Sequence, residues 1–261
     1  MPVIPLIWIP YLVPALLIAT RLSGLLVTGP FFGGDGIPAR VKAALVVAVT
    51  ILLVPMASPA VSAQPMVSWL GDGISEFAIG ALLGLAMRVV FDAVQLAGQV
   101  AGFQLGLAME TAIDPTTQAD STVLATFHNL VVLYVFLELG VHRAILRVLM
   151  GSFTTMPIGS TLAALTARQM LEFGGNIFVW GVELVLPVLL ATLLIDVTLG
   201  FFAKAAPQLP AIFIGIPVKT LCGYAILLAA VRFWPAIFTR EFGQALEFFM
   251  RTAHAGAGGL L

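Results

Sequence analysis

The sequence predicts an all-α integral membrane protein, and three observations support this prediction. Only 10% of the 261 residues are charged and 60% are hydrophobic, whereas a soluble domain carries about 25% charged residues. The mean hydropathy of +1.08 reflects apolar stretches close to the roughly 20 residues that a helix needs to cross a bilayer. No alternating strand pattern competes with the helical period in these stretches.

Six long apolar segments are expected to form helices. They cover residues 6–29, 43–63, 74–109, 122–141, 173–202 and 220–238. The third is too long for one span, because at 1.5 Å per residue it exceeds a hydrocarbon core of about 30 Å. Residues 143–168 read as a mixed connector, residues 206–219 as an apolar turn punctuated by prolines, and residues 240–261 as a polar tail. No linker separates two domains, so we expect a single helical unit over residues 1–261.

The positive charges leave the orientation in a membrane open. With the N-terminus outside, Arg40, Lys42, Lys204 and Lys219 would lie inside, but Arg143, Arg147 and Arg168 would lie outside. The rule that cytoplasmic loops are enriched in Lys and Arg therefore has no consistent solution. Either the spans are miscounted or some of the helices do not cross lipid.

Several classes of function are not expected for this composition. The net charge of −1 and the absence of a basic run argue against a nucleic-acid partner. The single cysteine, Cys222, cannot form an internal disulfide or build a metal site alone. No HExxH motif, cysteine pair or glycine-rich phosphate loop is present. We therefore expect no metal, no cofactor and no enzymatic activity.

The third apolar segment carries the most informative pattern. Arg88, Asp92, Gln95, Gln99, Gly102 and Gly106 are spaced by 4, 3, 4, 3 and 4 residues, and Gly98 extends a ridge with Gly102 and Gly106. At this spacing the side chains lie along one stripe of a helix. Small residues let helices pack closely, and Gly80 with Gly84 forms a second small pair. A polar stripe is also typical of a helix that faces a water-filled or substrate-conducting interior. Both interpretations stay open.

Four ionisable residues lie inside other apolar stretches: Glu138, Glu183, Asp196 and Arg232. Such residues face a bundle interior or mark an ion path, because charge in lipid is costly. A proton relay needs several carboxylates that face one another, and these are scattered over different helices. Polar contacts to neighbouring helices are therefore the favoured interpretation.

Short motifs punctuate most of the chain in a distinctive order. They are Arg21, Pro30-Phe31, Ile37-Pro38 and Val41-Lys42; the block from Gly106 to Asp114-Pro115; His142, Ser152-Phe153 and Pro157-Ile158-Gly159; and Ala206-Pro207-Gln208-Leu209 followed by Phe213 to Lys219. This order resembles the FliR family, the export-gate subunits of the bacterial flagellar type III secretion apparatus, and its injectisome counterparts. The Asp-Pro and Pro-Ile-Gly blocks resemble the flagellar members more. Pro210 departs from the family, which usually has Asn there, and proline removes a backbone donor.

The resemblance implies a subunit of a hetero-oligomeric export gate in the bacterial inner membrane, at the flagellar basal body. It implies FliP and FliQ type subunits as partners, FlhB and FlhA type export components, and secreted unfolded flagellar proteins. It also implies a FliP-like part over about residues 1–172 and a FliQ-like part over about residues 173–261. In such gates many helices pack on neighbouring subunits above the bilayer plane, which would explain the unresolved orientation.

The resemblance further implies a loop that plugs the pore until a substrate passes. Residue by residue it maps onto Gly106, Leu107, Ala108, Met109, Glu110, Thr111, Ala112, Ile113, Asp114 and Pro115. The alternative for this segment is an ordinary solvated connector. For the whole chain the alternatives are the injectisome counterpart of the gate and a small secondary transporter with a binding site at broken helices.

Overall fold

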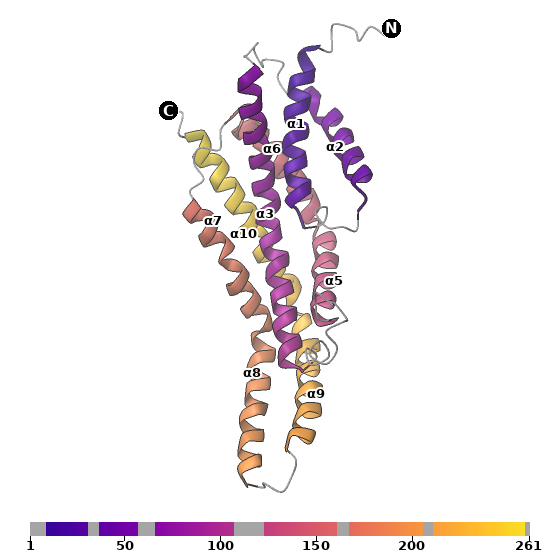
Figure 1. The fold of residues 1–261 in the computed structure, drawn as a ribbon, viewed down its shortest axis with the longest axis vertical. Helices are drawn as coiled ribbons and strands as arrows, with labels where there is room; N and C mark the ends of the chain where they lie inside the picture. Colours follow the sequence, from indigo (N-terminus) through magenta and orange to yellow (C-terminus); the bar gives the residue numbers. More distant parts are fainter. Residues whose placement is uncertain are drawn as a thin grey trace. The chain divides into compact units, whose positions relative to one another are not determined.

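The computed structural model describes residues 9–30, 37–56, 66–106, 123–160, 167–205 and 211–258 (Figure 1). Its elements are α1 (Ile9–Thr28), α2 (Ala39–Leu53), the short 3₁₀ turn η2 (Val54–Met56), α3 (Met66–Gln104), α5 (Val123–Glu138), α6 (Val141–Thr155), α7 (Ala167–Gly174), α8 (Asn176–Ala205), α9 (Ala211–Val231) and α10 (Trp234–Gly258). All of the regular structure in these ranges is helical, which confirms the predicted all-α class.

The chain forms two compact units that are interleaved in sequence. Unit 1 comprises Met1–Val89, Gly140–Phe173 and Phe242–Leu261, and unit 2 comprises Val90–Leu139 and Gly174–Glu241. The two long helices α3 and α10 contribute residues to both units. The division into parts at about residue 172, which follows the order of the chain, stays a prediction.

In unit 1, α1 packs against both α2 and α3 (Figure 1). Backbones of α1 and α3 touch at Gly24 and Gly80, where an added Cβ would lie closer than 3.0 Å to backbone atoms of the other helix. The Thr28 hydroxyl reaches across to the Ala81 carbonyl oxygen at 3.0 Å. The small pair Gly80 and Gly84 therefore supports close helix packing, as predicted. The apolar core beside this contact is built by Ile18, Leu22, Leu25, Leu53, Ile79, Leu82, Leu83, Leu149, Met156, Phe249 and Ala253.

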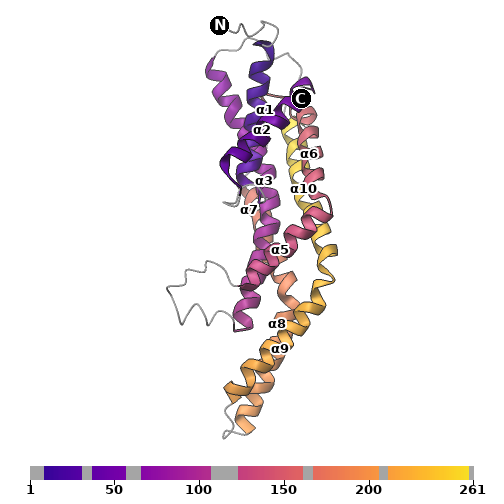
Figure 2. The ribbon, with the colours of Figure 1, turned by 90° about the vertical axis from the view of Figure 1, so that its right-hand side faces the viewer.

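In unit 2, α8 and α9 form an antiparallel hairpin, and Figure 2 shows the two helices side by side. Gly215 of α9 lies against the Leu199 side chain of α8. Elsewhere in the unit, the rings of His128 and Trp234 lie 4.7 Å apart between centroids. Unit 2 thus combines a long hairpin with a smaller aromatic core.

Several expected boundaries are wrong. The predicted turn at 206–219 is helical from Ala211 onward, with Pro217 inside α9. A proline inside a helix costs one backbone hydrogen bond, a loss that neighbouring helices in membrane proteins offset. The predicted span at 220–238 is interrupted between Val231 and Trp234, and the predicted polar tail forms most of α10. The expected connector at 143–168 contains most of α6 and the start of α7.

Among the described residues, three helical stretches are long and apolar enough to cross a membrane: Tyr11–Thr28, Trp69–Gln104 and Arg168–Ala205. Two bent pairs, α5 with α6 and most of α9 with most of α10, pass the same test when each pair is counted as one span, which gives up to five. The structure therefore supports the prediction of a membrane-embedded helical protein.

Candidate functional site

The polar stripe of α3 (Arg88, Asp92, Gln95 and Gln99) lies on the side of the helix away from its own apolar core. Arg88 is exposed and the other three residues are half-buried. The fully buried side chains of the same helix stretch, Ala86, Val90, Ala97 and Ala101, fall on the opposite face at 3.6 residues per turn. The stripe thus lies on the face of α3 opposite these buried side chains.

The three glycines of the predicted ridge have different surroundings. Gly98 packs directly on α5, because an added Cβ would lie 2.6 Å from the Ala125 Cα atom. Gly102 is buried. Gly106 is half-buried, and no described atom lies within 4 Å of the position of an added Cβ. The prediction that Gly106 belongs to a helix-packing or pore-facing stripe stays a prediction.

Gly106 ends α3 through its backbone conformation. Its φ is +81°, a left-handed value that glycine adopts without steric cost. The amide of Gly106 donates to the Phe103 carbonyl oxygen at 3.1 Å, which tightens the last turn. Glycine at such a position is the usual way for a helix to stop. The other residues of the predicted plug, 107–115, lie outside the described residues.

The last turn of α3 is held by α9. The Thr220 hydroxyl lies 3.0 Å from the Leu105 carbonyl oxygen and 2.9 Å from the Ile216 carbonyl oxygen of its own helix. An added Cβ on Gly223 would lie closer than 3.0 Å to the Leu105 Cδ2 atom, so the Leu105 side chain fills the space beside this glycine. Sequence reasoning missed Thr220 and Gly223, although two small residues three positions apart in an apolar helix were a usable signal.

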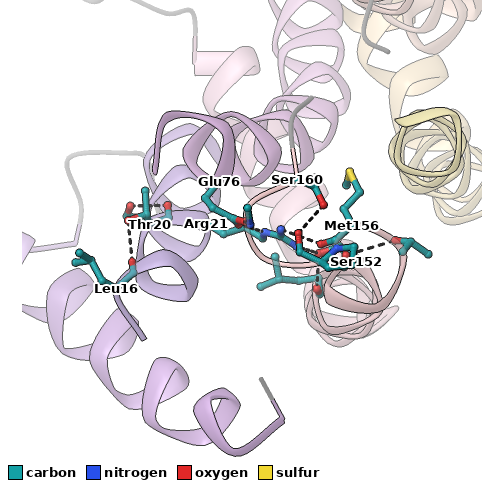
Figure 3. A network of polar contacts seen from close by, with 12 residues as sticks. Leu16, Thr20, Arg21, Glu76, Ser152, Met156 and Ser160 are labelled. Carbon is teal, nitrogen blue, oxygen red and sulfur yellow. Dashed lines mark hydrogen bonds and ion pairs between the residues drawn. The ribbon is translucent and has the colours of Figure 1, made fainter. Parts of the chain in front are cut away.

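A buried polar network in unit 1 centres on Arg21 (Figure 3). The guanidinium is fully buried and forms an ion pair with Glu76, with Nε and Oε2 2.5 Å apart. Its Nη1 donates to the Ser152 Oγ atom at 2.9 Å, and its Nη2 donates to the Met156 carbonyl oxygen at 3.1 Å. The Phe153 ring lies beneath the guanidinium at 4.2 Å from its centroid. Each guanidinium nitrogen therefore has an acceptor.

The second oxygen of Glu76 is also occupied. Oε1 accepts a hydrogen bond from the Gly159 amide at 3.0 Å. Gly159 has a φ of +88°, and an added Cβ there would lie 3.6 Å from the Asp72 carboxylate. The left-handed backbone aims the amide at Glu76, and any other residue would be strained there. The network thus fastens the turn after α6 to α3 and α1.

This network brings together motifs that lie far apart in the sequence. Arg21, Ser152-Phe153 and Gly159 were recognised separately as family motifs, and they meet at one point. Glu76, which joins them, was missed. Glu76 could have been found as a carboxylate near the start of a long apolar segment. A carboxylate that is buried there requires a positively charged or hydrogen-bonding partner.

Two ion pairs in unit 2 are partly exposed. Lys219 of α9 pairs with Asp196 of α8, and Arg240 of α10 pairs with Glu183 of α8, each at 2.7 Å. For Glu183 and Asp196, the predicted role as polar contacts between neighbouring helices is confirmed. Within the described ranges, no group of three or more His, Cys, Asp or Glu residues is placed to hold a metal ion.

Comparisons with known proteins agree with the motif order. Residues 12–245 match the family described as bacterial export proteins, family 1. The chain is 33% identical over 230 residues to flagellar biosynthetic protein FliR of Pectobacterium carotovorum subsp. carotovorum, with 87% of each chain covered. It is 31% identical to the protein of the same name from Escherichia coli K12, over 80% of each chain, and 23% identical to that of Caulobacter vibrioides, over 90% of this chain and 95% of the relative. The chain belongs to the family of bacterial export proteins, family 1, together with these FliR proteins.

Proposed function

We propose that the chain is a core subunit of the flagellar type III protein export gate, and that it helps to form and close the channel through which flagellar proteins are secreted. Relatives named flagellar biosynthetic protein FliR match most of its length. The observation that carries the proposal is the polar stripe of α3, which lies opposite the apolar core of the same helix. A polar face in that position is suited to line a water-filled path. In this proposal the chain carries out no covalent chemistry.

The proposed location is the bacterial inner membrane, at the flagellar basal body. The three apolar helical stretches of spanning length support a membrane location. The proposed partners are FliP and FliQ type subunits, with FlhB and FlhA type export components and unfolded flagellar substrates in contact with the assembled gate.

The surface of the α8–α9 hairpin supports a protein partner over lipid alone. Large apolar side chains on α8 are exposed, among them Leu194 at 67% and Phe201 at 71%. The partly exposed pair Lys219–Asp196 lies on the same hairpin. A charged pair facing hydrocarbon costs several kcal/mol, on the order of 2.5–3.5 per residue on insertion scales. A partner subunit would cover the apolar side chains and also offer polar groups to the ion pair.

We further propose that the segment from Gly106 to Pro115 closes the channel. Its first residue, Gly106, ends the helix that carries the polar stripe, so the segment would start at the wall of the proposed path. Few contacts would hold such a segment, and a passing chain would displace it. An ordinary solvated connector is the alternative for the same residues.

Deletion of residues 109–113 distinguishes a segment that closes the channel from an ordinary solvated connector. If the segment closes the channel, the gate still assembles, and cells expressing the variant become permeable to small ions and metabolites. Permeability is measured by dye or ion uptake, with the amount of assembled gate determined in the same membranes. Intact assembly with unchanged permeability would rule out the closing role.

Purification from the native membrane tests the assembly itself. A tagged chain is expected to bring FliP and FliQ type proteins with it in fixed proportion, as identified by mass spectrometry. A homo-oligomer without these proteins would instead support a secondary transporter.

A further inference from the structure

The outer face of α6 carries two arginines without an acidic partner in the described part of the chain. Arg143 and Arg147 are both exposed, and they lie one turn apart on the helix. No ion pair joins either of them to an acidic side chain within the described ranges. Two like charges at this spacing repel each other and destabilise an isolated helix. An anion that binds both side chains would remove this repulsion.

Exposed arginines on two neighbouring elements of the sequence are paired. Arg168 of α7 pairs with Glu172, and Arg251 of α10 pairs with Glu247, each across one helical turn. Helix α6 offers no such partner, because its sequence from Val141 to Thr155 contains neither Asp nor Glu. The lack of an acidic neighbour thus sets α6 apart from α7 and α10.

Apolar side chains alternate with the arginines on the same face of α6. Leu146 and Met150 are 43% and 39% exposed. They follow three residues after Arg143 and three residues after Arg147, so all four side chains share one stripe of the helix. On the other side, Leu149 lies in the apolar core of unit 1. A face that mixes arginine with apolar side chains fits the boundary between lipid headgroups and acyl chains, because an arginine lays its methylene groups along apolar surface and extends its guanidinium to the polar layer.

The residues that precede α6 are typical of a membrane interface. Helices α5 and α6 together pass as one bent membrane span. Near the end of α5, Tyr134 is 64% exposed, and tyrosine is enriched at the level of the headgroups. Glu138, the acidic residue nearest to the two arginines in the sequence, forms no ion pair with either of them in the described part. Gly140 then breaks the helix with a φ of +65°, so the polar residues begin where the apolar run of α5 ends.

We propose that the outer face of α6, formed by Arg143, Leu146, Arg147 and Met150, is a binding site for an anionic phospholipid. The two guanidinium groups bind the phosphate of the headgroup, and the two apolar side chains contact the acyl chains. Arginine binds phosphate through paired N–H donors, and anionic lipids attract basic residues close to a membrane surface. A lipid matches both the charges and the apolar side chains of this face, whereas a free phosphate ion matches the charges alone. The proposal depends on the membrane location of the chain and not on the proposed channel or its closure.

Binding of phosphatidylglycerol to the full chain, purified in detergent within its assembled complex, gives the first test. The double variant Arg143→Gln with Arg147→Gln removes both charges, and it also removes their repulsion, so the helix itself is not destabilised. The control Arg168→Gln with Arg251→Gln removes two exposed charges that have acidic partners. The α6 variant is expected to bind phosphatidylglycerol roughly ten- to thirtyfold more weakly than wild type, since each basic residue near an anionic headgroup contributes about fivefold in affinity. The control is expected to bind as wild type in a titration followed by native mass spectrometry.

Two further ligands separate the parts of the proposed site. Phosphatidylcholine has no net charge, and its affinity is expected to be the same for wild type and both double variants. Inorganic phosphate in excess, at constant ionic strength, is expected not to displace phosphatidylglycerol, because it makes no apolar contacts. Displacement by inorganic phosphate would overturn the assignment to a lipid. An equal loss of phosphatidylglycerol affinity in both double variants, or no loss in either, would overturn the site itself.

A second measurement keeps both arginines and so does not depend on how the double variant folds. A photoreactive residue replaces the exposed Met150 in the native membrane. Adducts with phospholipid are expected from this position. Adducts with another protein alone would overturn the proposal and would assign the outer face of α6 to a protein partner.

Discussion

Unit 1 contains a fully buried ion pair, whereas two ion pairs between helices of unit 2 are partly exposed. In unit 1, Arg21 and Glu76 are completely buried, and every polar atom that they offer has a partner within the unit. In unit 2, the pairs Lys219–Asp196 and Arg240–Glu183 are partly exposed, with between 20% and 48% of each side chain accessible. The Arg21–Glu76 pair thus fixes the fold of unit 1, whereas the two pairs of unit 2 lie at its surface, as do Arg168–Glu172 and Arg251–Glu247 of unit 1.

Both units have buried apolar residues and exposed large apolar side chains. The core of unit 1 joins residues of α1, α2, α3, α6 and α10. On α8 of unit 2, Phe178, Val179, Leu190, Leu194, Phe201 and Phe202 are each more than half exposed. An exposed apolar surface of this extent on a membrane-embedded chain is suited to contact lipid or another subunit. The exposed side chains of α8 therefore form a surface of unit 2 that another molecule can cover.

The largest effect is expected from breaking the buried pair in unit 1. Arg21→Met leaves the Glu76 carboxylate buried without its cation, which costs about 3–5 kcal/mol. The measurement is the free energy of unfolding of the chain in detergent. The double variant Arg21→Met with Glu76→Met removes both charges and is expected to recover most of the loss. Equal stability of Arg21→Met and wild type would show that unit 1 does not depend on this network.

The next largest effect is expected at the contact of α1 with α3. Gly80→Leu would place side-chain atoms into the backbone of α1 near Arg21. Forcing bulk into a packed contact costs about 1–3 kcal/mol, and more where backbone must move. Gly71→Leu on the same helix is the control, because nothing lies within 4 Å of an added Cβ there. Equal yields of folded protein from the two variants would contradict the close contact.

Features of this fold that depend on residues close together in the sequence were predicted, whereas contacts between residues far apart in the sequence were missed. The packing of Gly80 and Gly84 was predictable, because small residues at helical spacing are a local signal. Glu76 was not, because its partners lie 55 residues away at Arg21 and 83 residues away at Gly159. Pro217 misled the prediction, since it favours a turn in isolation and is accommodated here within α9. For the candidate site, the polar stripe was found from its spacing. The contacts of Thr220 and Gly223 with Leu105 were missed, because they join residues more than 100 positions apart, although the spacing of the two small residues in α9 was a usable signal.

The smallest effect is expected from the partly exposed pairs of unit 2. Lys219→Gln, which removes the charge opposite Asp196, should change the free energy of unfolding of the isolated chain by less than about 1 kcal/mol, because partly exposed pairs are weak. Unfolding in detergent, beside Arg21→Met, measures this difference. If the free energy of unfolding fell as much as in Arg21→Met, the partly exposed pair would stabilise this chain as much as the buried pair does.

The central claim is that the exposed apolar surface of unit 2 is covered by other export subunits, and site-specific photo-crosslinking in the native membrane tests it most directly. A photoreactive residue replaces Leu194 or Phe201 on α8, and the control position is the fully buried Val188 on the same helix. We expect adducts with FliP or FliQ type proteins from the two exposed positions, and none with another protein from Val188. Adducts with lipid alone from both exposed positions would contradict the claim.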